Sequence, residues 1–97
     1  MRELDSLSYF LSAIEDDVRV TIRHIGIYAA LLQYWKQWDY PYPIRAFSYE
    51  IMRVAKISSS ASYHKYIRDL DDYGYIRYLP SFKRNRGSSI YIVSSLF

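Results

Sequence analysis

A short helix followed by a β-hairpin, predicted between residues 57 and 93, constrains the fold of this chain more than any other stretch. Serines at residues 58–60 form a turn and open the helix, which extends to about residue 73. Apolar residues recur every three or four positions along it and define one core face: Tyr63, Ile67, Leu70 and Tyr73. Gly74 then suits the left-handed backbone position that ends a helix. A helix with a marked start, one apolar face and a marked end is therefore predicted, after a turn that lacks glycine.

A β-hairpin with a basic tip is predicted directly after this helix. Residues 75–79 and 88–93 alternate in the way that half-buried strands do. Pro80 cannot donate a hydrogen bond to a neighbouring strand, so the first of the two strands is expected at a sheet edge. The connecting residues 83–86 include three bases and no acid. The tip therefore presents positive charge that no neighbouring acid neutralises.

The start of this helix and the basic tip carry the side chains best suited to contact DNA. Free backbone amides and small hydroxyl groups at a helix start donate hydrogen bonds to phosphates. Hydroxyl, imidazole, ammonium and guanidinium groups also contact base edges in a major groove. The candidate DNA-binding residues are Ser59, Ser60, Ser62, His64, Lys65 and Arg68 on the helix, and Lys83, Arg84, Asn85 and Arg86 at the tip. The acids of the second half of the helix, Asp69, Asp71 and Asp72, are expected to point away from DNA. The alternatives are an ordinary amphipathic helix and a solvated loop.

Two further helices are predicted in the N-terminal part of the chain. Residues 1–16 form a helix or an ordered arm, with Asp5 or Ser6 as its cap. Residues 21–38 form a helix with Thr21 as N-cap, and its main apolar stripe is Ile22, Ile25, Tyr28, Ala29, Leu32, Trp35 and Trp38. Other apolar residues lie off this stripe, and a helix that is apolar nearly all round is buried on several sides. We therefore expect this helix at the centre of the fold, with apolar surface left for a second copy of the chain.

A short strand at residues 44–47 and a helix at residues 49–56 complete the predicted elements. Ser48 directly precedes this helix. Glu50 lies too early to complete a reciprocal capping bond, but its negative charge suits the first turn of a helix. The core side of the helix is formed by Ile51, Met52, Val54 and Ala55. Together with the hairpin, these elements predict a mostly helical α+β fold.

The composition excludes several classes of chemistry. Cysteine is absent, which excludes disulfides, zinc–thiolate sites and cysteine nucleophiles and fits a reducing compartment, so we expect a cytoplasmic protein. His24 and His64 lack the spacing of metal ligands, and the three glycines form no phosphate-binding motif, so no metal, no cofactor and no enzymatic activity are expected. No apolar run approaches the roughly 20 residues of a membrane span. The net charge of +3 is a weak indication of nucleic-acid binding.

The order of the predicted elements resembles the winged helix-turn-helix superfamily of DNA-binding proteins. Residues 62–76, SYHKYIRDLDDYGYI, resemble that superfamily's recurrent phrase TVSRxLxxLEExGLI. The positions that match in type and spacing are Ile67, Leu70, Gly74 and Ile76. The resemblance implies one winged-helix domain over residues 1–97, with the turn and recognition helix at residues 57–74 and the wing at residues 75–93.

Nearly the whole chain also resembles short, single-domain winged-helix proteins of bacterial mobile and conjugative elements. Segments similar to residues 10–35 and 74–82 recur among those proteins. This resemblance implies sequence-specific binding of double-stranded DNA by a transcriptional regulator. The recognition helix would lie in the major groove and the wing on the minor groove or the backbone. A homodimer through the N-terminal helices is expected.

Two other functions are consistent with the same sequence. The 12 tyrosines suit an interaction module that docks a protein partner, because tyrosine combines a large apolar ring with a polar tip. An architectural accessory factor for replication, excision or transfer of a mobile element would share the DNA-binding surface but bend its site. Binding to DNA, binding to a protein partner and bending of DNA distinguish the three.

Overall fold

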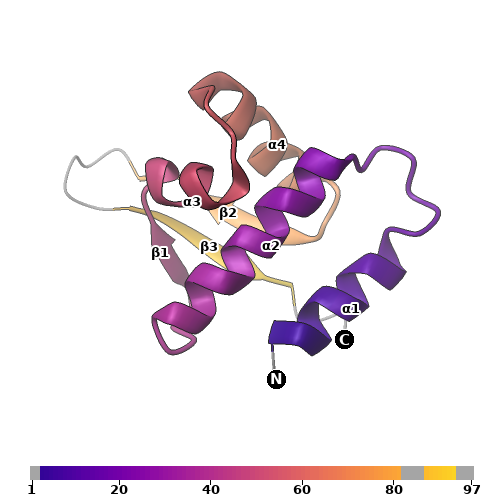
Figure 1. Cartoon of the computed structure of the whole chain (residues 1–97), viewed down its shortest axis with the longest axis horizontal. Coiled ribbons are helices and arrows are strands. Elements are labelled where there is room, and N and C mark those ends of the chain that lie inside the picture. Colours follow the sequence, from indigo (N-terminus) through magenta and orange to yellow (C-terminus); the bar gives the residue numbers. More distant parts are fainter. Residues whose placement is uncertain (1–2, 82–86, 94–97) are drawn as a thin grey trace.

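The computed structural model describes residues 3–81 and 87–93. Within these ranges the protein is α+β and mostly helical, with four helices and a small antiparallel sheet (Figure 1). The elements follow in the order α1 (Glu3–Ala13), α2 (Ile22–Gln37), β1 (Ile44–Ala46), α3 (Ser48–Ala55), α4 (Ser60–Asp72), β2 (Ile76–Leu79) and β3 (Ser88–Ile92). The predicted type and order of these elements are confirmed. No helix in the described ranges is both long and apolar enough to cross a lipid bilayer.

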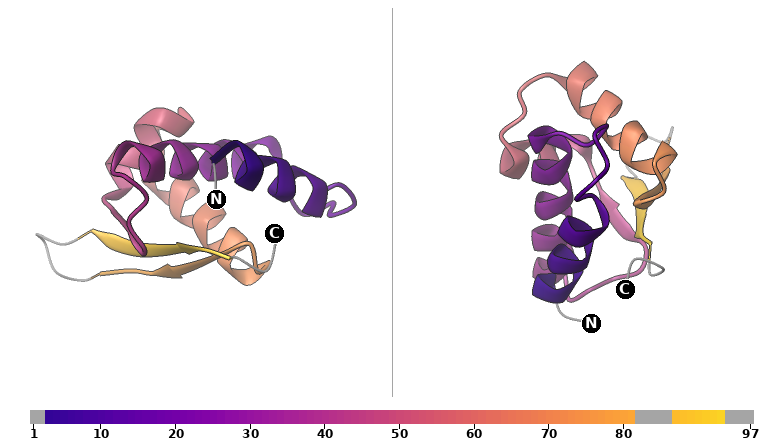
Figure 2. Two further views of the ribbon diagram at one scale, coloured as in Figure 1. Left: turned by 90° about the horizontal axis from the view of Figure 1, so that it is seen from below. Right: turned by 90° about the vertical axis from the view of Figure 1, so that its right-hand side faces the viewer.

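The sheet joins strands that are far apart in the sequence. Its order is β1-β3-β2 with antiparallel pairing throughout, and Ile44 of β1 lies opposite Ile90 of β3. In this sheet β2 is an edge strand, as Pro80 directly after it predicts. Helices α1 to α3 lie on one side of the sheet (Figure 2, left). The exposed side chains of Arg45 and Arg77 alternate with buried residues of β1 and β2, so the two arginines lie on the outer face.

Helix α2 is the central element and contacts α1, α3 and α4. Its buried residues are His24, Ile27, Tyr28, Ala30, Leu31, Leu32 and Trp35. The prediction that this helix is buried on several sides is confirmed, but the predicted stripe is wrong at both ends. Ile22 is 82% exposed and Trp38 is 58% exposed. A helix that is apolar nearly all round gives periodicity no single face to identify, so only the packing decides which residues are covered.

The starts of the helices differ from the prediction at two places. Thr21 is the N-cap of α2 as expected, but α1 already includes Asp5 and Ser6, so neither caps it. Helix α3 begins one residue earlier than predicted. Phe47 therefore occupies its N-cap position, and the Phe47 backbone N–H donates to Oε1 of Glu50 at 2.9 Å. The inference that Glu50 lies too early for such a bond is wrong, because it assumed the later start.

The turn between α3 and α4 uses a lysine where glycine is common. Lys56 adopts the left-handed conformation with φ of 62°. The backbone N–H groups of Lys56 and Ile57 both donate to the carbonyl of Met52, which satisfies the end of α3. A residue other than glycine pays roughly 1–2 kcal/mol in this conformation. The glycine-free turn of the sequence is therefore formed, with local strain at Lys56.

Candidate nucleic-acid interface

Helix α4 carries the predicted DNA-contacting residues and is fixed at both ends. At its start, Oγ of Ser59 accepts a hydrogen bond from the backbone N–H of Ser62 at 3.2 Å, which is an N-cap bond. At its end, Gly74 has a φ of +88°, so the predicted left-handed stop is confirmed. Of the predicted core face, Tyr63, Ile67 and Leu70 are buried and Tyr73 is half-buried. The helix therefore presents its opposite face outward.

The predicted contact residues of α4 divide into an exposed and a half-buried group. Ser59, Ser60, Lys65 and Arg68 are exposed, and Ser62 and His64 are half-buried. Nδ1 of His64 lies 2.8 Å from the carbonyl oxygen of Ser60. A carbonyl only accepts, so Nδ1 carries the proton and donates to it. In the neutral ring this leaves Nε2 of His64 as a hydrogen-bond acceptor.

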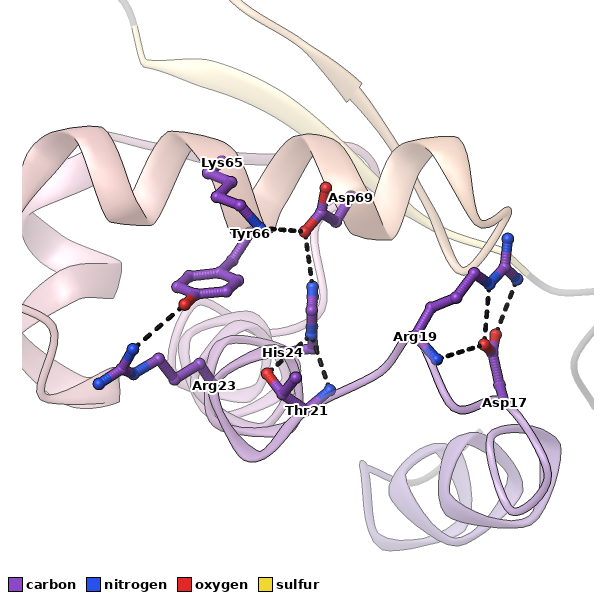
Figure 3. Close-up of polar contacts among 8 residues, drawn as sticks. All are labelled: Asp17, Arg19, Thr21, Arg23, His24, Lys65, Tyr66 and Asp69. Atoms are coloured by element: carbon purple, nitrogen blue, oxygen red, sulfur yellow. Dashed lines mark hydrogen bonds and ion pairs between the residues drawn. The ribbon is translucent and has the colours of Figure 1, made fainter.

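Lys65 and Asp69 form an ion pair one turn apart on α4. The Lys65 ammonium lies 3.2 Å from Oδ2 of Asp69, and the two side chains are 67% and 21% exposed. The same carboxylate oxygen lies 2.9 Å from Nε2 of His24 on α2 (Figure 3). Partial burial raises the pKa of Asp69, but the hydrogen bonds from His24 and Lys65 outweigh burial and lower this pKa below its ordinary value. Asp69 is therefore engaged within the fold, and the expectation that the acids of α4 point away from DNA stays a prediction.

His24 is a buried link between α2 and α4. Its side chain is 2% exposed. Nδ1 accepts a hydrogen bond from the Thr21 backbone N–H at 2.8 Å, so in the neutral ring Nε2 carries the proton and donates to Asp69. The imidazole thus accepts the N–H of the N-cap residue of α2 and connects this end of α2 to the second half of α4. This role of His24 was not predicted from the sequence, because its partner Asp69 lies 45 residues away in the chain.

A comparison with known protein families, curated proteins and solved structures finds no match to this chain. Within the described ranges, no three histidine, aspartate or glutamate side chains lie close enough together to hold a metal ion.

Arg23 and Tyr66 extend the exposed face of α4 and were missed from the sequence. Nη1 of Arg23 donates to the hydroxyl of Tyr66 at 3.2 Å. The Lys65 ammonium also lies 4.9 Å from the centre of the Tyr66 ring (Figure 3). The two cations therefore flank one half-buried tyrosine, although α2 and α4 are far apart in the sequence. No local signal marks Arg23, which stands in an otherwise ordinary helix start.

Arg19 lies in a different environment, where its guanidinium contacts other side chains of the protein. Its guanidinium donates to the carboxylate of Asp17 through Nε and Nη2, both at 2.8 Å. It also lies 4.1 Å from the centre of the Tyr73 ring. Oδ2 of Asp17 further accepts a hydrogen bond from the Tyr75 hydroxyl at 2.6 Å. These contacts join the α1–α2 loop to the end of α4. Because its guanidinium is engaged in them, Arg19 does not belong to the candidate interface.

The basic tip lies outside the described residues. Lys83, Arg84, Asn85 and Arg86 fall within the gap between residues 81 and 87, so their predicted role stays a prediction. The strands on both sides of the gap are described, with Leu79 paired to Ser89. Gly87 lies so close to Ala46 of β1 that an added Cβ would be 2.7 Å from the Ala46 carbonyl group. The base of the hairpin is therefore packed against β1.

Proposed function

We propose that this protein binds double-stranded DNA as a winged helix-turn-helix transcriptional regulator. In this proposal, α3 and α4 form the helix-turn-helix, α4 lies in the major groove, and residues 83–86 contact the minor groove or the backbone. The observation that carries the proposal is the outward face of α4. Its core side is buried, while Ser59, Ser60, Lys65 and Arg68 are exposed on the side that begins at the N-terminal end of the helix, where backbone amides favour anions.

The ion pair of Lys65 is compatible with this role. An exposed pair four residues apart on a helix stabilises by only about 0.3–0.5 kcal/mol. A DNA phosphate carries a full negative charge and attracts the Lys65 ammonium. Because the ion pair with Asp69 contributes so little free energy, its loss on DNA binding would cost little. Asp69 would keep its hydrogen bond from His24 when Lys65 turns to a phosphate. Arg23 would contact a further phosphate of the DNA backbone, because its guanidinium and the Lys65 ammonium both lie beside Tyr66.

Binding to duplex DNA across a salt series tests the proposal. Each phosphate contact contributes about 0.9 to the slope of log affinity against log salt concentration. We expect the double variant Lys65→Ala, Arg68→Ala to lower this slope by roughly two contacts' worth, and Arg84→Ala, Arg86→Ala to do the same. Lys36→Ala, in the last turn of α2, removes one charge away from α4 and is the control. Binding without a salt slope, or equal losses in the control, would contradict the proposal.

We further propose that the regulator is a homodimer through its N-terminal helices. Apolar side chains are exposed on α1, in the loop that follows it and at the start of α2: Leu11 at 43%, Val18 at 95% and Ile22 at 82%. Sedimentation equilibrium of wild type and of Ile22→Lys tests this contact. A lysine in an apolar interface leaves a desolvated charge, so the variant is expected to be monomeric. A wild-type protein that stays monomeric at all concentrations measured would contradict the proposed dimer.

A further inference from the structure

A hollow of about 520 Å³ lies between the end of α2 and β1, and none of its lining residues belongs to α4. We name it the Arg45 pocket, and its lining residues are Tyr34, Trp38, Pro41, Tyr42, Pro43 and Arg45. Trp38 and Tyr42 are 58% and 60% exposed, which is unusual for such large rings. Its lining consists of aromatic and prolyl residues and one charged residue, Arg45. Its volume falls in the range of about 300–1,000 Å³ typical of small-molecule sites.

The loop that forms one wall of the pocket is held in a strained conformation by its own hydrogen bonds. Asp39 and Tyr40 both have left-handed backbones, with φ of 63° and 59°. Two bonds fix this loop: the Tyr40 N–H donates to the carbonyl of Trp35 at 2.8 Å, and Nε1 of Trp35 donates to the carbonyl of Pro41 at 2.7 Å. Strain of this kind is concentrated at functional sites, where the surrounding structure holds a shape ready for a ligand. The pocket wall is therefore formed before anything binds.

Arg45 is the one charged residue among those that line the pocket. Arg45 is exposed, and none of the carboxylates in the described part of the chain forms an ion pair with it. The nearby acid Glu50 is already engaged, because its two oxygens accept from the Phe47 N–H at 2.9 Å and the Tyr34 hydroxyl at 3.2 Å. The Tyr34 hydroxyl also lies 3.2 Å from the carbonyl oxygen of Arg45. The N–H groups of the Arg45 guanidinium are therefore available to donate hydrogen bonds to an anion.

We propose that the Arg45 pocket binds a small planar aromatic carboxylate. The aromatic ring of the ligand would lie against the rings of Trp38 and Tyr42, because offset and edge-on ring pairs are favourable. Its carboxylate would take two parallel hydrogen bonds from Arg45, the geometry that a guanidinium offers to a carboxylate. None of the lining residues is among the proposed DNA contacts, so either proposal can fail without the other.

Isothermal titration calorimetry of the full chain without DNA tests the site, with naphthoate as the probe. Naphthamide keeps the ring system and loses the charge, and cyclohexanecarboxylate keeps the charge and loses the aromatic ring. We expect naphthoate to bind at least about tenfold more tightly than either, since a charge-assisted bond and an aromatic contact each contribute on the order of one tenfold step. Equal affinity of naphthoate and either analogue, or no heat at millimolar naphthoate, would overturn the proposal.

Two arginines of the sheet provide a matched pair of variants. Arg45→Gln is expected to weaken naphthoate binding about tenfold and to leave naphthamide binding unchanged. Arg77→Gln, on the other edge strand, removes the same exposed charge from the outer face without touching the pocket, and it is expected to change neither. Trp38→Ala is expected to weaken both probes. An equal loss in both arginine variants would show a general charge effect and overturn the assignment to this pocket.

Discussion

Removing the imidazole of His24 should destabilise the protein strongly, because the ring fills space and makes hydrogen bonds in the core. The side chain is 2% exposed and bonds the Thr21 N–H at 2.8 Å and Asp69 at 2.9 Å. Truncating a buried side chain to alanine costs about 2–5 kcal/mol, and each lost hydrogen bond adds about 0.5–1.5 kcal/mol. We therefore expect His24→Ala to lower the free energy of unfolding by at least about 3 kcal/mol, a large part of the 5–15 kcal/mol typical of a domain.

A double-mutant cycle separates the link to Asp69 from the loss of volume. Asp69→Ala alone leaves the buried Nε2–H of His24 without its acceptor, which costs about 1–3 kcal/mol. In a His24→Ala background that donor is gone, so the same change should cost much less, and we expect a coupling energy of about 1–2 kcal/mol. Urea unfolding at neutral pH, followed by circular dichroism, measures all four proteins. Effects that add to within about 0.5 kcal/mol would refute the link. Lys65→Ala is the control, with an expected change below about 0.5 kcal/mol because its pair is exposed.

Three further changes have defined outcomes in the same unfolding assay. Gly26→Ala should stabilise α2 by about 0.5–1 kcal/mol, because its Cβ would meet nothing nearer than 3.9 Å. Gly87→Ala should cost about 1–3 kcal/mol, because its Cβ would lie 2.7 Å from backbone atoms of β1; equal effects would contradict this contrast. Lys56→Gly should stabilise by roughly 0.5–1 kcal/mol by relieving the left-handed backbone, and a loss of stability would argue against that strain. Hydrogen bonds from Arg19 and Tyr75 hold the pKa of Asp17 well below its ordinary value, so its contribution is present above the unfolded pKa of about 3.9. It is lost as the pH falls through the folded pKa, and the stability gap between wild type and Asp17→Asn should therefore shrink below about pH 4. The neighbouring Asp16→Asn is the control, and a constant gap would contradict the reasoning.

Local chemistry made several elements readable from the sequence. Three features of α4 depend only on residues close together in the chain, and the structure has all of them. They are the serines at its start, the spacing of Tyr63, Ile67 and Leu70, and the stop at Gly74. Errors arose where two local signals competed. The start of α3 was placed one residue late because Ser48 is the better capping residue by type, whereas Glu50 bonds back to Phe47 and moves the start forward.

The candidate interface was only partly predictable for the same physical reason. The exposed residues of α4 follow from helical periodicity, so Ser59, Lys65 and Arg68 were found from the sequence alone. Arg23 joins that face through Tyr66, from a helix 43 residues away. No pattern within either segment encodes that meeting.

The amino-acid sequence by itself determined the helices, the strands and the outward face of α4, because these depend on periodicity, capping and turn chemistry over a few residues. Only the tertiary structure decided which of the apolar residues of α2 are buried, since they lie on more than one side of this helix. It also decided that His24 and Asp69 meet, and that Arg45 borders an aromatic hollow. Contacts of this kind join segments that are distant in the chain, and they form only once packing has fixed where each segment lies.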